Sequence, residues 1–196
     1  MIAMISGCGS NVASIQCALE RLGKKSHLTQ DVHEIQSASH VILPGVGTAG
    51  SAMQRLDQLK LLDVIRTLKQ PVLGICLGMQ ILHAFSEESD GLECLNIFPG
   101  KIVDFAHIPH LVIPHMGWNQ IQVSANPLFE NIQSGSYVYF VHRFKAALTA
   151  QTIASSFYGE TFAAAVQSDN FYGVQFHPER SGKIGEIILQ NFLNLG

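Results

Sequence analysis

The sequence has little charge of either sign and no long apolar run. Charged residues make up 14% of its 196 residues, and the formal net charge is −3. Without a basic stripe, nucleic acid is not expected as a partner. No apolar run approaches the about 20 residues that cross a bilayer, and the N-terminal MIAMIS lacks the basic start of a signal peptide. We therefore expect a cytoplasmic protein with no membrane partner.

Cysteine is also scarce, and its spacing excludes the common cysteine frameworks. The four cysteines form no CxxC pair, so neither a zinc framework nor a redox motif is predicted. Thiols stay reduced in the cytosol, where a special cysteine is more often reactive than half of a disulfide. The four are Cys8, Cys17, Cys76 and Cys94.

Apolar residues are abundant, at 47% of the chain, and can fill the core of one domain spanning residues 1–196. In the first half, short apolar runs alternate with helical spacing, whereas the second half is rich in strand-like segments. This order predicts an α/β fold with a central, mostly parallel sheet flanked by helices, and antiparallel additions in the second half. We expect strands at 1–6, 39–45, 72–76, 101–105, 119–123, 137–144, 152–158, 162–167 and 171–176, and helices at 12–23 (closed by Gly23), 51–69 and 184–195.

The stretch GICLG places a cysteine between two glycines at the end of an apolar run. The pattern is the cysteine form of a nucleophile elbow, which predicts that Cys76 sits on a strained strand-to-helix turn. We expect the helix to continue through MQILHAF (79–85), so that its positive end favours a thiolate. The backbone N–H of Leu77 would then help to bind an oxyanion. An inert buried cysteine is the alternative, but the strand, the glycines and the helix together favour a nucleophile.

A cysteine nucleophile needs a base and a group that orients the base. His177 stands out among nine histidines because it ends the strand-like run YGVQFHPE. Pro178 favours an extended His177, and in an extended chain Glu179 points the same way and can fix the imidazole tautomer. A surface turn is the alternative for this motif taken alone.

Three histidines lie close together in AHIPHLVIPHMGWN and suggest a metal site. Their spacings of three and five fit no common zinc pattern, and no cysteine joins them. We therefore expect ordinary loop histidines and no metal. The three are His107, His110 and His115.

Several motifs together resemble the class I, triad-type glutamine amidotransferases, which have a flavodoxin-like fold. PGVG (44–47), GICLGMQ (74–80) and QFHPERS (175–181) occur in that family's order and roughly at its spacing. Three further stretches are similar to the glutaminase subunits of imidazole glycerol phosphate synthase. They are PHMGWN (114–119), YFVH (139–142) and NFYGVQFHPERSG (170–182).

The resemblance implies that L-glutamine is hydrolysed through a thioester on Cys76, with His177 moving the proton and Glu179 orienting it. Ammonia would pass to a cyclase subunit with a TIM-barrel fold, which forms imidazole glycerol phosphate and AICAR from PRFAR in histidine biosynthesis. The two subunits would form a heterodimer, and no cofactor is implied.

The resemblance also assigns supporting residues, position by position. Gln80 and Glu88 would contact the glutamine, and the backbone of Arg143 and Phe144 would hold its carboxylate end. The second oxyanion donor would be a backbone N–H near Val46 or Gly47. The partner interface would include Trp118, His115 and Asn119.

The sequence departs from the family pattern in two places. The first turn, ISGCGSNVAS, lacks the usual acidic residue and carries one extra residue, and Val12 replaces the third glycine that a phosphate loop over Gly7–Gly9 would need. Arg143 and Phe144 replace the usual Ser or Thr followed by Tyr. Two alternatives stay open. One is a paralogous subunit that feeds a synthase for surface-glycan sugars. The other is a non-catalytic regulatory subunit, against which the intact triad counts.

Overall fold

A computed structural model describes residues 1–6, 12–105 and 110–196; the expectations for Gly7–Asn11 and for His107 lie outside these residues. Within them, 13 strands join in one sheet. Its first five strands are parallel to one another, as the alternation of strands and helices predicts. In spatial order they are β2 (Ser26–Thr29), β1 (Ile2–Ile5), β3 (His40–Leu43), β4 (Val72–Ile75) and β13 (Phe171–Val174).

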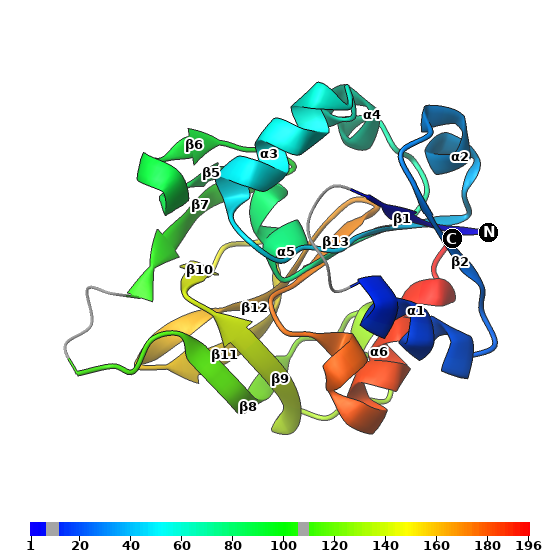
Figure 1. The fold of residues 1–196 in the computed structure, drawn as a ribbon. Coiled ribbons are helices and arrows are strands. Elements are labelled where there is room, and N and C mark those ends of the chain that lie inside the picture. The colour runs from blue at the N-terminus through cyan, green and yellow to red at the C-terminus, as the bar shows by residue number, and fades with distance from the viewer. Residues whose placement is uncertain (7–11, 106–109) are drawn as a thin grey trace.

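Helices cover both faces of this parallel sheet (Figure 1). Residues of one strand alternate between two hydrophobic clusters: Ala3 and Ile5 of β1 pack into one, and Ile2 and Met4 into the other. The period of two arises because successive side chains point to opposite faces. One face is covered by α2 (Val32–Ser37), α3 (Ala49–Gln58) and α4 (Leu62–Arg66), and the other by α1 (Val12–Arg21) and α6 (Gly182–Leu193).

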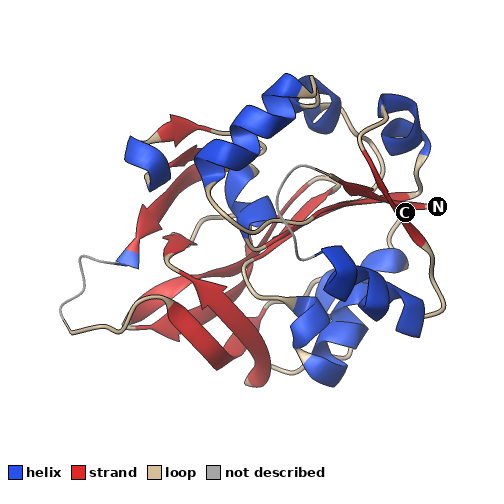
Figure 2. Cartoon of the chain, in the orientation of Figure 1, coloured by secondary structure: helices blue, strands red, loops and turns tan. Residues whose placement is uncertain are grey.

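Beyond β13 the sheet continues with mainly antiparallel strands, most of them from the second half of the chain (Figure 2). The fold class predicted from the sequence, α/β with antiparallel additions, is confirmed. No helix in the described part of the chain is long and apolar enough to cross a membrane. The added strands are β5 (His83–Ser86), β6 (Leu92–Glu93), β7 (Phe98–Asp104), β8 (His115–Val123), β9 (Ser136–His142), β10 (Phe144–Ala146), β11 (Thr152–Tyr158) and β12 (Glu160–Ser168), and the short 3₁₀ helices are η1 (Glu88–Asp90), η3 (Pro127–Phe129) and η4 (Pro178–Arg180).

The single helix predicted over 51–69 is wrong, because the chain breaks between α3 and α4. Lys60 has a φ of 57°, and the N–H of Leu61 donates to the carbonyl of Leu56. Both leucines are fully buried. This is a Schellman-type helix end with its hydrophobic contact, and it turns the chain without interrupting the apolar spacing. The spacing alone therefore could not reveal the break.

The helix predicted to continue through 79–85 is also wrong. α5 (Leu77–Ile81) is a five-residue helix, and β5 begins at His83. The carbonyls of Ile81 and Leu82, which a longer helix would use internally, accept hydrogen bonds from Leu95 and Ile97 instead. Pairing with a distant segment therefore replaces the helix.

Candidate active site

Cys76 occupies the predicted strained turn between β4 and α5. Its φ is 54° and its ψ is −110°, a backbone conformation that L residues rarely adopt. The two glycines allow the turn to pack closely. A Cβ on Gly78 would lie 1.9 Å from the carbonyl oxygen of Leu43, and one on Gly74 would lie 2.7 Å from the backbone of Gly78. The elbow therefore requires glycine at both positions.

The loop Pro44–Gly47 lies directly against this elbow. A Cβ on Gly45 would come within 2.4 Å of the backbone nitrogen of Gly78, so no larger residue fits there. Gly47 differs: its φ is +102°, yet a Cβ there would meet nothing within 4 Å. The loop is thus tightly packed at Gly45 and open at Gly47.

His177 and Glu179 form a buried pair beside Cys76. The Nδ1 atom of His177 lies 2.7 Å from Oε1 of Glu179, and the two side chains are 3% and 0% exposed. His177 is extended, with φ −100° and ψ 97°, as Pro178 predicts, but Glu179 lies in η4. The extended geometry expected for Glu179 is therefore wrong, although the contact between the two side chains is present.

The surroundings of His177 set its charge. Burial alone would lower its pKa, but side-chain hydrogen bonds to Cys76 and Glu179, together with their charges, raise the pKa to about 10. The carboxylate also defines the ring orientation, because Nδ1 must donate to it, which turns Nε2 toward the thiol side. A protonated imidazole beside a thiol is an arrangement suited to nucleophilic chemistry.

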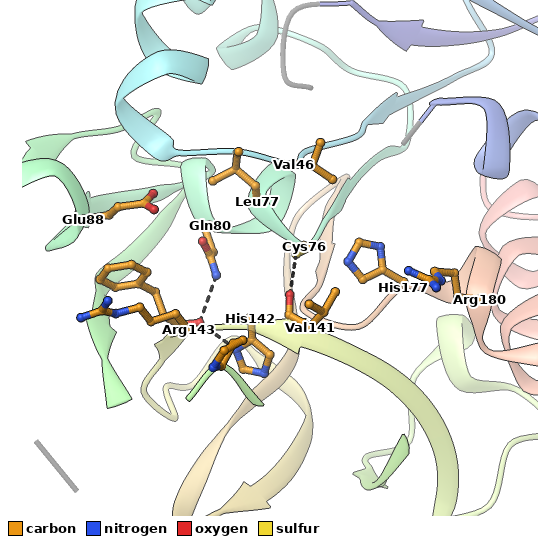
Figure 3. Close-up of a pocket in the computed structure, with 13 residues that line it drawn as sticks. Val46, Cys76, Leu77, Gln80, Glu88, Val141, His142, Arg143, His177 and Arg180 are labelled. Atoms are coloured by element: carbon orange, nitrogen blue, oxygen red, sulfur yellow. Dashed lines mark hydrogen bonds between the residues drawn. The ribbon is translucent and has the colours of Figure 1, made fainter. Parts of the chain in front are cut away.

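These residues open onto a cavity of about 570 Å³ (Figure 3). Its lining comes from the elbow, the Pro44–Gly47 loop, the start of β10 and the end of β9. Glu179 lies behind His177 and is absent from the lining. The sequence-predicted residues that line the cavity are Val46, Gly47, Cys76, Leu77, Gln80, Glu88, Arg143, Phe144 and His177, and Pro114, Val141, His142 and Arg180 join them.

Gln80 has a fixed orientation on the cavity wall. Its Nε2 donates to the carbonyl of Phe144 at 3.0 Å and to Oε1 of Gln175 at 2.9 Å. Both amide hydrogens are therefore engaged, and Oε1 is the atom of this amide that can meet a ligand donor. Gln175, which is fully buried, was not among the site residues predicted from the sequence. A polar residue inside the apolar run YGVQF was the signal.

Glu88 and Arg143 lie at the end of the cavity that is farther from His177 (Figure 3). The Glu88 carboxylate accepts a hydrogen bond from the backbone N–H of Ala49, at the start of α3. The Arg143 guanidinium pairs with Asp104 at 2.7 Å. Asp104 therefore engages the Arg143 side chain, and the carbonyl of Phe144 is taken by Gln80.

A pair of buried histidines extends from the cavity wall, where His142 lies, into the protein. His115 and His142 are direct cross-strand neighbours, and their Nδ1 and Nε2 atoms are 2.9 Å apart. His142 also lies 2.8 Å from the carbonyl of Phe144 through Nδ1, and His115 lies 3.2 Å from the Asn119 amide through Nε2. Burial lowers the pKa of His142 to about 3 and that of His115 to about 4.

These contacts bear on the predicted partner interface. Trp118 is 56% exposed, whereas His115 is 3% exposed and stacks on Phe140 and Tyr158. An interface role for His115 would therefore be indirect, through Asn119. Exposed apolar side chains surround Trp118 on the outer face of β8 and β9. They are Met116 and Tyr137.

The histidines considered for a metal site do not gather in the described structure. His110 lies in a turn before β8 and His115 is buried within β8, and His107 lies outside the described residues. Across residues 1–6, 12–105 and 110–196, no three His, Cys, Asp or Glu side chains are close enough to hold an ion. The expectation of no metal stays a prediction.

Comparison with known proteins adds sequence and fold relatives. Residues 5–195 match the family model described as glutamine amidotransferase class-I. The imidazole glycerol phosphate synthase subunit HisH of Idiomarina loihiensis is 51% identical, over 95% of this chain and 93% of that protein. Subunit HisH 2 of Legionella pneumophila is 48% identical, over 100% and 98%. A solved structure described as a glutamine amidotransferase is 16% identical, with a TM-score of 0.76 over 98% and 96% of the two chains.

Proposed function

The chain belongs to the class-I glutamine amidotransferases and, within them, to the HisH subunits of imidazole glycerol phosphate synthase, and we propose that Cys76, His177 and Glu179 carry out its glutaminase reaction. The observation that carries this proposal is the arrangement of a strained cysteine and a buried histidine at one cavity, with a buried carboxylate bonded to the histidine. Residues 1–196 act as one amidotransferase domain, since β4 and β13, from opposite halves of the chain, pair at the site.

The reaction begins with His177 protonated and Cys76 as the thiolate. The sulfur attacks the carboxamide carbon of glutamine, and the carbonyl oxygen becomes an oxyanion. His177 then gives its Nε2 proton to the nitrogen, the C–N bond breaks, and ammonia leaves a thioester on Cys76. Water attacks the thioester while His177 takes a proton from it, and cleavage of the C–S bond yields glutamate and restores the thiolate. Glu179 holds the tautomer and stabilises the imidazolium throughout.

The oxyanion would be bound by backbone donors from two neighbouring segments. Leu77 offers its N–H at the start of α5, and the second donor comes from Val46 or Gly47 in the adjacent loop. Both segments line the cavity beside Cys76. Because Gly47 is open and already has a positive φ, the peptide between Val46 and Gly47 can rotate without displacing the packed Gly45. Such a rotation would switch the second donor on or off.

Glutamine itself would lie between the elbow and the start of β10. Oε1 of Gln80 is an acceptor, so it suits an N–H of the substrate. Glu88 is a carboxylate in the same cavity, and its charge suits the substrate ammonium. The carboxylate end of glutamine would meet the backbone of Arg143 and Phe144. In these assignments each hydrogen-bonding or charged group of glutamine meets a complementary group of the protein.

The partner subunit would dock on the outer face of β8 and β9. Trp118, Met116 and Tyr137 present exposed apolar surface there, and aromatic residues are enriched at interface hot spots. This face continues to the cavity mouth, because Trp118 packs on Tyr139 and Arg180 lies over the Tyr139 ring at 4.7 Å. A cyclase with a TIM-barrel fold seated here would receive ammonia directly.

The test is a steady-state glutaminase assay of the chain alone, with the cyclase, and with the cyclase plus its nucleotide substrate. A missing oxyanion donor costs roughly two to three orders of magnitude in rate. We therefore expect weak activity alone and a stimulation of about a hundredfold or more in the liganded complex. A free chain that already turns over at the rate of the liganded complex would contradict the switch at Val46–Gly47.

Gly47→Val separates the switch from loop packing. The added side chain meets open space but disfavours the positive φ, so the loop should lose one of its two states and the stimulation should shrink. Gly23→Ala is a matched control, because Gly23 also has a positive φ with nothing within 4 Å of an added Cβ and lies at the end of α1. The control should keep the full stimulation.

A further inference from the structure

A fully buried glutamine, Gln175, contacts the sulfur of Cys76 from within the protein. Its Nε2 lies 3.7 Å from Sγ, which is within the range of an N–H···S contact. Gln175 follows β13 and its side chain has no exposed surface, and it is not among the residues that line the cavity. It therefore contacts the reacting atom without contacting the substrate.

The direction of this contact follows from one backbone carbonyl. The Phe144 oxygen can only accept, so the Gln80 atom at 3.0 Å from it must be the donor Nε2. The second hydrogen of the same Nε2 then donates to Gln175, whose facing atom must be Oε1. Once Oε1 faces Gln80, the Gln175 atom that faces Sγ is the donor Nε2. No alternative amide orientation satisfies all three contacts.

A donor held at this position favours a charged sulfur over a neutral one. A neutral thiol is a weak acceptor, whereas a thiolate accepts strongly, and hydrogen bonds to charged groups are worth more than neutral ones. The carbonyl of Val141 lies 3.7 Å from Sγ on another side and suits only the protonated thiol, as an acceptor. The sulfur thus lies between one group that favours S–H and another that favours S⁻.

We propose that Gln175 is a catalytic hydrogen-bond donor to the Cys76 thiolate, oriented by Gln80. The inference rests on the proposed role of Cys76 as nucleophile and deepens it. Gln175 holds the sulfur in its attacking position and supports the negative charge that it carries before attack and regains when the thioester is cleaved. His177 supplies the proton transfer, and Gln175 supplies charge stabilisation from within the protein.

The experiment uses the full chain and needs no partner. The rate of Cys76 alkylation by iodoacetamide at fixed pH reports the thiolate, and peptide mass spectrometry separates Cys76 from Cys17 and Cys94. Gln175→Met keeps side-chain length but removes the donor to Sγ, together with the acceptor that faces Gln80. We expect its Cys76 alkylation rate to fall about tenfold to a hundredfold, the loss expected for a hydrogen bond to a charged group. Gln175→Leu serves if the methionine variant does not fold.

Gln167→Met is the matched control. Gln167 lies on β12, which pairs with β13, and its amide bonds Tyr172 rather than Cys76. Its alkylation rate should equal that of the wild type. Equal Cys76 rates in Gln175→Met and wild type, with both folded by circular dichroism, would overturn the role of Gln175. Wild-type Cys76 reacting no faster than exposed Cys17 would instead overturn the proposed nucleophile.

Discussion

His177 and His142 line the same cavity and are almost equally buried, at 3% and 5% exposed, yet their charges differ. The pKa of His177 is raised to about 10, and the pKa of His142 is lowered to about 3. Burial lowers the pKa of both rings, so burial does not distinguish them. Glu179 and Cys76 face His177, whereas another neutral imidazole and a backbone carbonyl face His142.

The contrast shows how the wall of one cavity can hold a protonated histidine that serves as a proton donor and a neutral histidine that orients its neighbours. A buried carboxylate holds the proton on His177. The charge of His177 in turn contributes to lowering the pKa of His142, so the charged pair (His177, Glu179) reinforces the neutrality of His142 within the neutral pair (His142, His115). A neutral His142 donates through Nδ1 to the Phe144 carbonyl, which also orients Gln80.

The largest expected effect comes from removing the ring of His177. His177→Ala should lower kcat by about 10³-fold or more, because the leaving nitrogen would have no acid. His142→Phe removes an equally buried ring and should lower kcat less than about tenfold while raising KM, since Gln80 and Phe144 lose support. Steady-state assays of both variants check this. Comparable losses of kcat would erase the distinction between the two rings.

The next effect tests the carboxylate that holds the charge. Glu179→Gln keeps the size of the side chain but removes its charge, so the pKa of His177 should fall and its imidazolium should lose support. We expect a loss of kcat of at least about tenfold but smaller than that of His177→Ala, because the base remains. Glu186→Gln is a matched control, because Glu186 lies on α6 and does not line the cavity. Wild-type kcat in Glu179→Gln would remove Glu179 from the mechanism.

The charged pair and the neutral pair should also make stability depend on pH in opposite directions. Between pH 6.5 and about 10 the folded state holds a proton on His177 that the unfolded state has lost, so this pair stabilises less as pH rises. Between pH 6.5 and about 4, His142 and His115 bind protons in the unfolded state but stay neutral in the folded state. Stability therefore falls as pH falls.

Urea unfolding at a series of pH values measures the free energy of unfolding on both sides of its maximum, the alkaline arm and the acidic arm. The expected slope is about 1.4 kcal/mol per pH unit for each proton. His177→Ala should flatten the alkaline arm, and a double His115→Phe, His142→Phe variant should remove its two protons from the acidic arm. The rest of that arm comes from His83, whose pKa burial lowers to about 4, and from His40, whose pKa burial also lowers. An acidic arm that persists unchanged in the double variant would show that the neutral pair is not its cause.

The smallest effect concerns the bond within the neutral pair. Either His115→Phe or His142→Phe leaves a buried imidazole without its partner, at a cost of about 1–3 kcal/mol in the free energy of unfolding. The double variant should cost less than the sum of the two, because no ring is then left unsatisfied. A double-mutant cycle by urea unfolding gives the coupling energy. Strict additivity would contradict the hydrogen bond between the rings.

Much of the fold could be predicted because its signals are local. The apolar runs predicted β1, β3 and β4, and Gly23 ends α1 with a φ of +71°. The missed helix α2 also had a local signal: the Asp31 side chain caps the N–H of Glu34, a spacing that DVHE displays. β2 lacked one, since SHLT has no apolar alternation and forms by pairing with β1.

The site divides in the same way. The glycines around Cys76 and the proline after His177 act on their own neighbours, so their consequences are readable from the chain. The neutral pair is different, because His115 and His142 meet through the register of β8 and β9. Gln175 likewise gains its direction from Gln80, 95 positions away in the chain. Such roles depend on contacts between segments that no spacing encodes.

The most direct test of the contrast is nitrogen-15 NMR of histidine-labelled protein at pH 7.5, with His177→Ala and His142→Phe used to assign the signals. The rings of His177 and His142 should differ in protonation. Both ring nitrogens of His177 should be protonated, whereas His142 should carry its proton on Nδ1 alone. A neutral His177, or a doubly protonated His142, at this pH would contradict the account.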